Sequence, residues 1–167
     1  KRSNNHYRGF LYVGLMIVKK EPFLIEFNVR MGDPECQVIL PRLNSDFIKI
    51  IHNAVIDNLR KVNIKWKKEK SMTIVLCSKG YPGNYKKNVL ITKINKIKFD
   101  KKIKIYHAGT KLKGGNMVSA GGRVLNFTST GNSFFKIRKV ILKSLQIFNW
   151  KAGFYRKDIG WRVINKR

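Results

Sequence analysis

The most informative stretch of this sequence lies near its start and reads Ile25-Glu26-Phe27-Asn28-Val29-Arg30-Met31-Gly32-Asp33-Pro34-Glu35. Its first half alternates apolar and polar side chains, which is the pattern of a β-strand with one buried face. We therefore expect Ile25, Phe27 and Val29 to point into a core. The other three side chains would share the opposite face.

That opposite face carries Glu26, Asn28 and Arg30. Neighbours on one face of a strand lie about 7 Å apart at the backbone, so a carboxylate and an amide oxygen can meet at one small cation. Magnesium prefers hard oxygen ligands and completes its shell with water and nucleotide phosphates. The adjacent arginine would suit a developing phosphoryl charge. The same spacing also occurs in an ordinary strand whose polar face is solvated. Judged on spacing alone, that alternative is more frequent than a metal site.

The segment Gly32-Asp33-Pro34-Glu35 predicts the start of a short helix that ends near Pro41. Asp33 fits the N-cap, where it would contribute about 1 kcal/mol, and Pro34 fits the first helical position. Glu35 fits the first turn. A helix N-terminus beside a metal site would also receive a carboxylate or phosphate, and one helix end can serve both purposes.

The surrounding pattern predicts an α+β fold in two parts. An apolar strand at 10–18, buried on both faces, should form a hairpin with 23–30. A helix should start at Ser45-Asp46, with the serine as its cap. The lysine-rich segment 60–70 marks the expected domain boundary. We place the first domain at 1–64 and the second at 65–167.

The second domain should contain three strands, at 72–77, 103–107 and 123–128. A turn follows the first strand at Gly80-Tyr81-Pro82-Gly83. An amphipathic helix is expected over 133–148. Its predicted buried stripe consists of Phe135, Val140, Ile141, Leu145 and Phe148.

The chain is strongly basic, with 36 Lys and Arg residues against 9 Asp and Glu and a net charge of +27. Such a charge often indicates nucleic acid or an anionic membrane as a partner. Here the lysines are spread through segments equally rich in Ile and Asn, and no zinc-finger, RNP or clear helix-turn-helix pattern accompanies them. We expect weak, sequence-blind RNA binding at low salt and no specific nucleic-acid partner.

Several features bear on the cell compartment. The longest apolar run, at 10–18, is too short to cross a bilayer, and no signal peptide is visible. We expect a cytoplasmic protein without a membrane partner. Cys36 and Cys77 match no zinc spacing and are expected to be reduced thiols, with a single disulfide as the alternative. The chain opens on Lys1 rather than Met, which suggests a cut through a longer protein.

Residues 26–37 closely resemble the E-F-N-x-R-x-G-D-P-E-x-Q signature of phosphoribosylamine–glycine ligase, an ATP-grasp enzyme of purine synthesis. The flanking segments at 7–16 and 40–46 resemble the same family. Four later blocks resemble its C-terminal part in the right order: 80–85, 107–111, 121–125 and 156–162. The resemblance covers nearly the whole chain.

The resemblance implies a reaction in which ATP phosphorylates the carboxylate of glycine, and the amine of 5-phosphoribosylamine attacks the glycyl phosphate. It implies that Glu26 and Asn28 bind Mg²⁺ or Mn²⁺ on the ATP phosphates and that Arg30 is catalytic. It implies that glycine contacts the four residues Gly32, Asp33, Pro34 and Glu35. Lys111 and Arg123 are candidates for the ribose phosphate, with solvated sheet-edge charges as the alternative.

The family's N-terminal and ATP-binding lobes have no counterpart in these 167 residues. We expect the chain alone to be inactive and to need those lobes as partners. It would be a fragment, one chain of a split enzyme or the remnant of a decaying gene. The alternative hypotheses are a basic nucleic-acid-binding module and a fragment of another ATP-grasp ligase.

Overall fold

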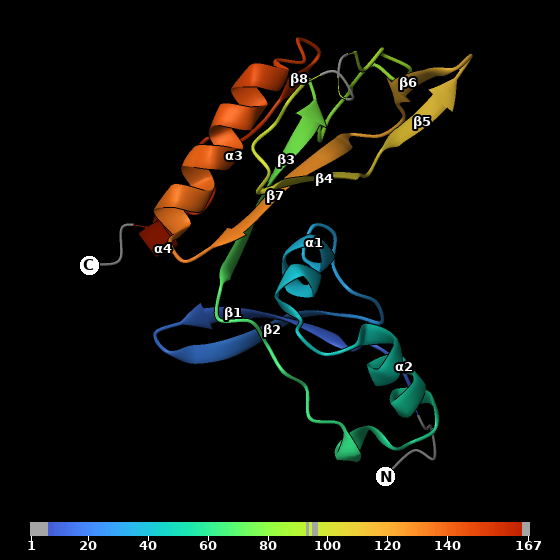
Figure 1. Ribbon diagram of the computed structural model, residues 1–167, viewed down its shortest axis with the longest axis vertical. Helices are drawn as coiled ribbons and strands as arrows, with labels where there is room; N and C mark the ends of the chain where they lie inside the picture. The colour runs from blue at the N-terminus through green and yellow to red at the C-terminus, as the bar shows by residue number, and fades with distance from the viewer. Residues whose placement is uncertain (1–6, 93, 95–96, 165–167) are drawn as a thin grey trace. The chain divides into compact units, whose positions relative to one another are not determined.

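The structure is a computed structural model that describes residues 7–92, 94 and 97–164, so the opening residues 1–6 lie outside the described part. The chain forms two compact units. The first unit comprises Lys1–Cys36 with Leu43–Lys67, and the second comprises Gln37–Arg42 with Lys68–Arg167. Both units combine strands with helices (Figure 1), which confirms the α+β class.

The first unit is built on a β-hairpin. Strand β1 (Tyr12–Val18) pairs antiparallel with β2 (Glu21–Asn28). Lys19 and Lys20 form the turn, and both have positive φ (49° and 73°). Two positive φ values define the type I′ two-residue turn, whose twist matches that of the strands. The predicted hairpin is confirmed.

The predicted burial of this hairpin is wrong. In β1 only Gly14 is buried, and the strand from Leu15 onward is exposed. Ile25, Phe27 and Val29 are 61%, 59% and 70% exposed instead of lying in a core. Within the described chain β1 and β2 pair with each other alone. A two-stranded ribbon without a packing layer leaves both faces open, whatever its sequence.

Helix α2 (Phe47–Val55) follows in the first unit. Its cap is Asp46, whose Oδ1 accepts a hydrogen bond from the Lys49 amide at 3.1 Å. The prediction of a serine cap is therefore wrong. The Ser45 hydroxyl is engaged elsewhere, because it accepts a hydrogen bond from the Lys65 amide at 2.7 Å. A short 3-10 helix, η2 (Leu59–Lys61), comes after α2.

The helix expected after Gly32 starts later than predicted. Helix α1 covers only Cys36–Ile39 and continues into the 3-10 helix η1 (Leu40–Arg42). Residues 33–35 form a turn that is closed by a 2.9 Å hydrogen bond from the Cys36 amide to the Gly32 carbonyl. Asp33 is therefore not the N-cap, and Pro34 is not the first helical residue. The turn delays the helical conformation until Cys36.

The second unit contains an antiparallel sheet in the order β4-β7-β3-β8. The predicted central strands are confirmed and extended. The sheet strands are β3 (Lys70–Ser78), β4 (Ile103–His107), β7 (Arg123–Gly131) and β8 (Gly153–Phe154). A separate hairpin of β5 (Thr110–Lys113) and β6 (Asn116–Ser119) was not predicted.

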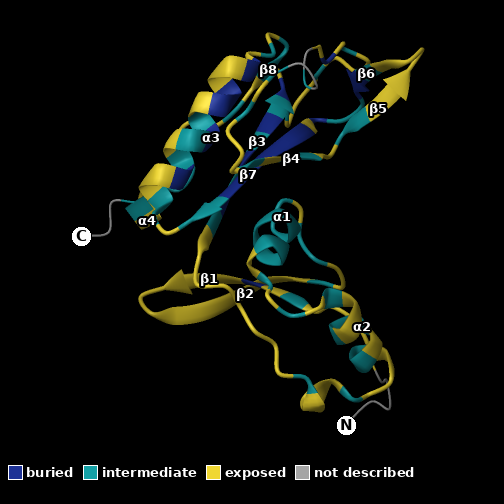
Figure 2. Ribbon diagram, in the orientation of Figure 1, coloured by how far each residue is buried: buried dark blue, intermediate teal, exposed yellow. Residues whose placement is uncertain are grey.

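Helix α3 (Phe134–Phe148) lies along one face of this sheet (Figure 1), and a short helix, α4 (Trp161–Ile164), comes near the chain end. Figure 2 shows the dark, buried surfaces of β3 and β7 beside the helix. The buried positions of α3 are Ile137, Ile141, Ser144, Leu145 and Phe148. Phe135 was predicted in this stripe but is 61% exposed, because it lies about 200° around the helix from Ile137. Val140 is only partly buried.

Both cysteines are free thiols. None of the helices in the described residues is long and apolar enough to span a membrane.

Candidate functional site

Glu26 and Asn28 share one face of β2, as the alternation predicts, whereas Arg30, expected on the same face, lies beyond the end of the strand. The Asn28 side chain donates a hydrogen bond from Nδ2 to Glu26 Oε1 at 3.1 Å. The two residues are i and i+2 in an exposed strand, so this contact places both side chains on one face. A carboxylate and an amide carbonyl therefore stand side by side. Both supply the hard oxygen donors that Mg²⁺ and Mn²⁺ accept.

Strand β1 supports this pair from across the hairpin. Gly14 lies opposite Glu26, and Tyr12 lies opposite Asn28. A Cβ at position 14 would meet Glu26 Cγ at 3.1 Å and Tyr12 Cε1 at 3.5 Å. Glycine at this position leaves the Glu26 side chain its space, which explains why the only buried residue of β1 is a glycine.

Glu35 belongs to the same neighbourhood. Hydrogen bonding to the Glu35 carboxylate, followed by the charge of that carboxylate, burial and the charge of Glu26, raises the pKa of Tyr12. A Cβ at Gly32 would lie 1.6 Å from Glu35 Oε2, so the carboxylate occupies the place of a side chain at position 32. Glu35 Oε2 is itself buried and has no hydrogen-bond partner among the described residues. A buried carboxylate oxygen of this kind can accept from a ligand donor.

The remaining predicted residues of the first unit lie nearby in sequence but are engaged differently. Arg30 follows the end of β2, and its Nη1 donates to the Met31 carbonyl at 3.0 Å. Asp33 and Pro34 occupy the turn before α1. The structure therefore brings together Glu26, Asn28 and Glu35 through Tyr12, while Arg30 points to its own backbone neighbour.

Lys111 and Arg123 lie in the second unit. Lys111 is an exposed residue of β5, and Arg123 opens β7 opposite Cys77. Their segments are in contact, because the Gly109 amide donates to the Arg123 carbonyl at 2.8 Å. Burial raises the pKa of the Cys77 thiol, and the Arg123 charge partly offsets that rise. Arg123 therefore acts electrostatically on its strand partner.

The donor set around Glu26 is small. Within the described ranges there is no group of three or more His, Cys, Asp or Glu side chains that could hold a metal ion by itself. Two oxygen donors fit a cation whose other ligands are water and phosphate, which is how Mg²⁺ is held beside nucleotides. The residues present therefore fit a shared metal–nucleotide site and not an all-protein cage.

Tyr12 is the residue that the sequence did not reveal. Nothing in the apolar run at 10–18 distinguishes it from its neighbours, because its importance depends on the register that sets it opposite Asn28. A one-residue slip of the hairpin would turn it to the other face.

Comparison with known proteins shows which class of protein has this sequence. Residues 1–36 match the family model described as phosphoribosylglycinamide synthetase, ATP-grasp (A) domain. Residues 71–162 match the model described as phosphoribosylglycinamide synthetase, C domain. The class is thus an ATP-grasp segment followed by the C domain of a synthetase.

The similar proteins agree. Phosphoribosylamine–glycine ligase of Brucella melitensis is 43% identical over 160 residues, which is 96% of this chain and 38% of that protein. The chloroplastic enzyme of the same name from Arabidopsis thaliana is 44% identical, over 95% of this chain and 31% of its own length. The crystal structure of phosphoribosylamine–glycine ligase from Thermotoga maritima superposes with a TM-score of 0.76 at 30% identity. It covers 91% of this chain and 37% of that one.

The chain belongs to the phosphoribosylglycinamide synthetase family. It spans about two-fifths of the length of the bacterial relatives that it matches. The family resemblance that residues 26–37 indicated is confirmed.

Proposed function

We propose that this chain is the C-terminal portion of an ATP-dependent phosphoribosylamine–glycine ligase. In this proposal residues 1–64 complete an ATP-grasp domain, and residues 65–167 form the C-terminal domain. The observation that carries the proposal is the contact between Glu26 and Asn28, with Glu35 joined to them through Tyr12. The site needs ATP, glycine and 5-phosphoribosylamine as ligands.

The polar face of β2 would hold the metal–nucleotide complex. Glu26 and Asn28 supply two oxygen ligands to Mg²⁺ or Mn²⁺ on the ATP phosphates. The bound cation would neutralise phosphate charge as the γ-phosphoryl group moves to the glycine carboxylate. Arg30 would release the Met31 carbonyl and donate to the phosphoryl oxygens, since an arginine fork matches them better than a single carbonyl.

The turn after β2 would bind glycine. Glu35 Oε2 is buried without a partner, and a carboxylate oxygen can accept a hydrogen bond from the glycine ammonium. Gly32 keeps the space into which this carboxylate fits. Asp33 and Pro34 shape the turn that presents Glu35. Lys111 and Arg123 would contact the ribose phosphate of the amine substrate.

The proposal also accounts for the open hairpin. Apolar side chains exposed on both faces of β1 and β2 are costly in water and usually mark a surface that another element covers. The N-terminal and ATP-binding lobes of the family are the expected covering layers. A chain that carries only the polar face of β2 cannot grip ATP, so we expect these lobes to be required for turnover.

The decisive experiment supplies those lobes by fusion or as a partner chain and measures glycine-dependent ADP formation with phosphoribosylamine and Mg²⁺. Glu26→Gln keeps the size of the side chain but removes the charged ligand. We expect at least a hundredfold loss of turnover, equivalent to about 2.7 kcal/mol of barrier. Asn28→Ala should act in the same direction with a smaller effect, because a neutral ligand is lost.

Glu21→Gln is the matched control. Glu21 is the first residue of the same strand and pairs with Val18 beside the hairpin turn, away from the polar pair. We expect activity within about twofold of the parent for this variant. Near-normal activity in Glu26→Gln, or an equal loss in Glu21→Gln, would show that the metal assignment is wrong.

A further inference from the structure

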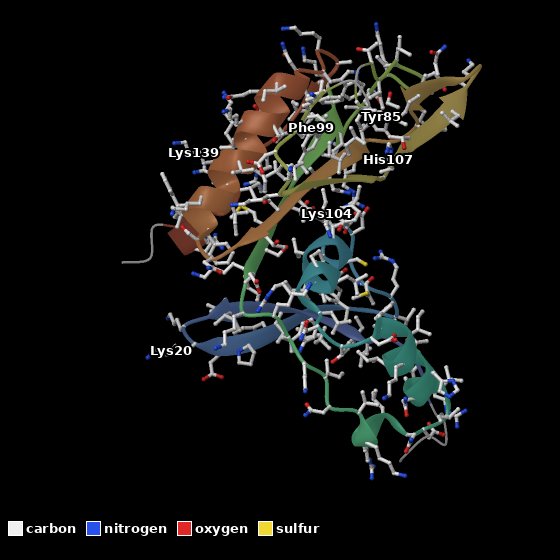
Figure 3. The ribbon with its side chains drawn as sticks, viewed as in Figure 1. Lys20, Tyr85, Phe99, Lys104, His107 and Lys139 are labelled. Carbon is white, nitrogen blue, oxygen red and sulfur yellow. The ribbon has the colours of Figure 1, made fainter. Side chains whose placement is uncertain are left out.

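Tyr12 connects the hairpin of the first unit to the turn that follows β2. It is the first residue of β1 and lies directly opposite Asn28, whereas Lys20 marks the turn at the other end of the two strands (Figure 3). The Tyr12 hydroxyl is hydrogen-bonded to the Glu35 carboxylate. A side chain of β1 is therefore bonded to the turn at 33–35, which lies beyond the end of β2.

The two carboxylate oxygens of Glu35 differ in their surroundings. Oε2 is buried and has no hydrogen-bond partner among the described residues, so the Tyr12 hydroxyl is bonded to the other oxygen, Oε1. The missing side chain of Gly32 leaves room for Oε2, because a Cβ at that position would lie 1.6 Å from this oxygen. One oxygen of Glu35 is thus held, and the other is left to accept a hydrogen bond.

The backbone alone does not fix this carboxylate. The turn is closed by the 2.9 Å hydrogen bond from the Cys36 amide to the Gly32 carbonyl, which places the Glu35 backbone. A glutamate side chain still has several rotatable bonds beyond its Cα, and ordering them costs conformational entropy. The Tyr12 hydroxyl limits that freedom. It therefore sets the direction in which Oε2 can accept.

The charges near Tyr12 indicate which kind of ligand group suits Oε2. The carboxylates of Glu35 and Glu26 both act on Tyr12 electrostatically. The Glu26 carboxylate already accepts from Asn28 Nδ2 at 3.1 Å, so the metal pair is held by a hydrogen bond of its own. A second carboxylate with a free oxygen favours a cationic donor, and an ammonium group is such a donor.

We propose that Tyr12 is a positioning residue for the amino-acid substrate, whose hydroxyl holds the Glu35 carboxylate so that Oε2 receives the glycine ammonium. The inference rests on the proposed ligase function and adds to it a residue that acts through Glu35. Loss of the hydroxyl should therefore weaken glycine binding. It should leave the metal pair in place, because Glu26 and Asn28 hold each other independently.

The test uses the ligase assembled by fusing the missing lobes to this chain, and measures ADP formation while glycine, ATP and Mg²⁺ are varied in turn. Tyr12→Phe keeps the ring beside Gly14 and removes the hydroxyl alone. We expect KM for glycine to rise about tenfold, because a hydrogen bond to a charged group is lost. The values of kcat, KM for ATP and the Mg²⁺ concentration for half-maximal activity should stay within about twofold of the parent.

Tyr7→Phe is the matched control. The Tyr7 hydroxyl donates to the backbone carbonyls of Phe10 and Val29, at 2.7 and 3.4 Å, and no carboxylate takes part. This variant also loses one hydroxyl from the first unit, so it reproduces any general effect of such a loss. We expect its KM for glycine to stay within about twofold of the parent.

A double variant decides whether Tyr12 acts through Glu35. Glu35→Gln should itself raise KM for glycine, because the charged acceptor of the ammonium is lost. In that background Tyr12→Phe should change KM for glycine less than about twofold, since the group through which the hydroxyl acts is gone. A full tenfold rise in both backgrounds would show that the two residues act independently, and would overturn the proposal.

The remaining outcomes separate the role of Tyr12 from the ligase assignment. Absence of glycine-dependent ADP formation in the parent fusion would overturn the ligase assignment and the glycine site with it. An active parent in which Tyr12→Phe behaves like Tyr7→Phe would overturn the role of Tyr12 alone. The same holds if Tyr12→Phe raised KM for glycine and KM for ATP equally, because a general structural defect would then explain both.

Discussion

Strand β1 of the first unit and strand β7 of the second unit differ in burial, and the difference is the reverse of what their sequences suggest. The run Tyr12-Val13-Gly14-Leu15-Met16-Ile17-Val18 is almost wholly apolar, yet all but two of its residues are exposed. The run Arg123-Val124-Leu125-Asn126-Phe127-Thr128-Ser129-Thr130-Gly131 is mixed, yet six consecutive residues of it are buried. Figure 2 shows the contrast as a yellow hairpin and a dark central strand.

The difference lies in the layers that each strand has around it. β7 is an inner strand between β4 and β3, and α3 covers one of its faces. Its polar side chains are accommodated, as Thr128 shows by donating to Thr73 Oγ1 at 2.8 Å. β1 has one strand partner in the described chain, and its residues from Leu15 onward are exposed. Burial therefore depends on the completeness of the layers and not on the apolar content of a strand.

The largest effect is expected from a comparison of two single substitutions, in which a buried and an exposed phenylalanine are each replaced by alanine. Phe127 is fully buried and contacts the rings of Phe99 and Phe148. We expect Phe127→Ala to lower the free energy of unfolding of the second unit by about 3–5 kcal/mol, through lost transfer energy and a cavity. Phe27→Ala, at a side chain that is 59% exposed, should cost less than about 1 kcal/mol. Urea unfolding followed by circular dichroism measures both, and equal losses would contradict the layer argument.

A smaller loss of stability is expected at Gly109, where two backbone segments of the second unit lie close together. A Cβ at Gly109 would lie 2.6 Å from the Arg123 carbonyl oxygen and 2.7 Å from Gly121 Cα. Gly109→Ala must therefore move backbone, and we expect a loss of about 1–3 kcal/mol in the same unfolding experiment. Gly131→Ala is the control, because its Cβ would make an ordinary 3.5 Å contact with Ile137. A neutral Gly109→Ala would mean that the two segments are not held together as described.

The alkylation rate of the Cys77 thiol provides a measure of its burial. Because burial raises its pKa, less thiolate is present at a given pH, and alkylation by iodoacetamide should be slower than in the urea-unfolded chain. Arg123→Gln removes the positive charge that lowers the pKa, so the midpoint of the pH–rate curve should move further upward. The rates are measured on a Cys36→Ser background. A downward shift in Arg123→Gln would contradict the pairing of Arg123 with Cys77.

The smallest effect is expected at the exposed pair of Arg156 and Asp158. Arg156 donates from Nε and Nη2 to the two Asp158 oxygens at 3.1 and 2.6 Å. These hydrogen bonds lower the pKa of Asp158 below its usual value. A lowered folded-state pKa stabilises the fold above the unfolded-state pKa, and this contribution is lost as the pH falls through the folded-state value. Arg156→Gln should therefore reduce the acid dependence of stability slightly, and an NMR titration of Asp158 should show its pKa rising.

The sequence predicted the elements better than their surroundings. Alternation placed Glu26 and Asn28 on one face, and the Asn28–Glu26 hydrogen bond agrees with it. Caps were less predictable, because Ser45 and Asp46 are both good capping residues. In the structure Asp46 caps α2, while the Ser45 hydroxyl accepts from the distant Lys65 amide. The predicted start of the helix after Gly32 was wrong for a similar reason. Local preference favoured Pro34, whereas the turn hydrogen bond set the start at Cys36.

The sequence by itself determined the family, the strand that carries Glu26 and Asn28, and the helix that begins after Ser133. These depend on local periodicity and on short motifs, which act over a few residues. Only the tertiary structure decided that Tyr12 joins the site and that β1 stands open while β7 is buried. Each of these depends on strand register or on a second layer, and such contacts join residues that the chain itself keeps far apart.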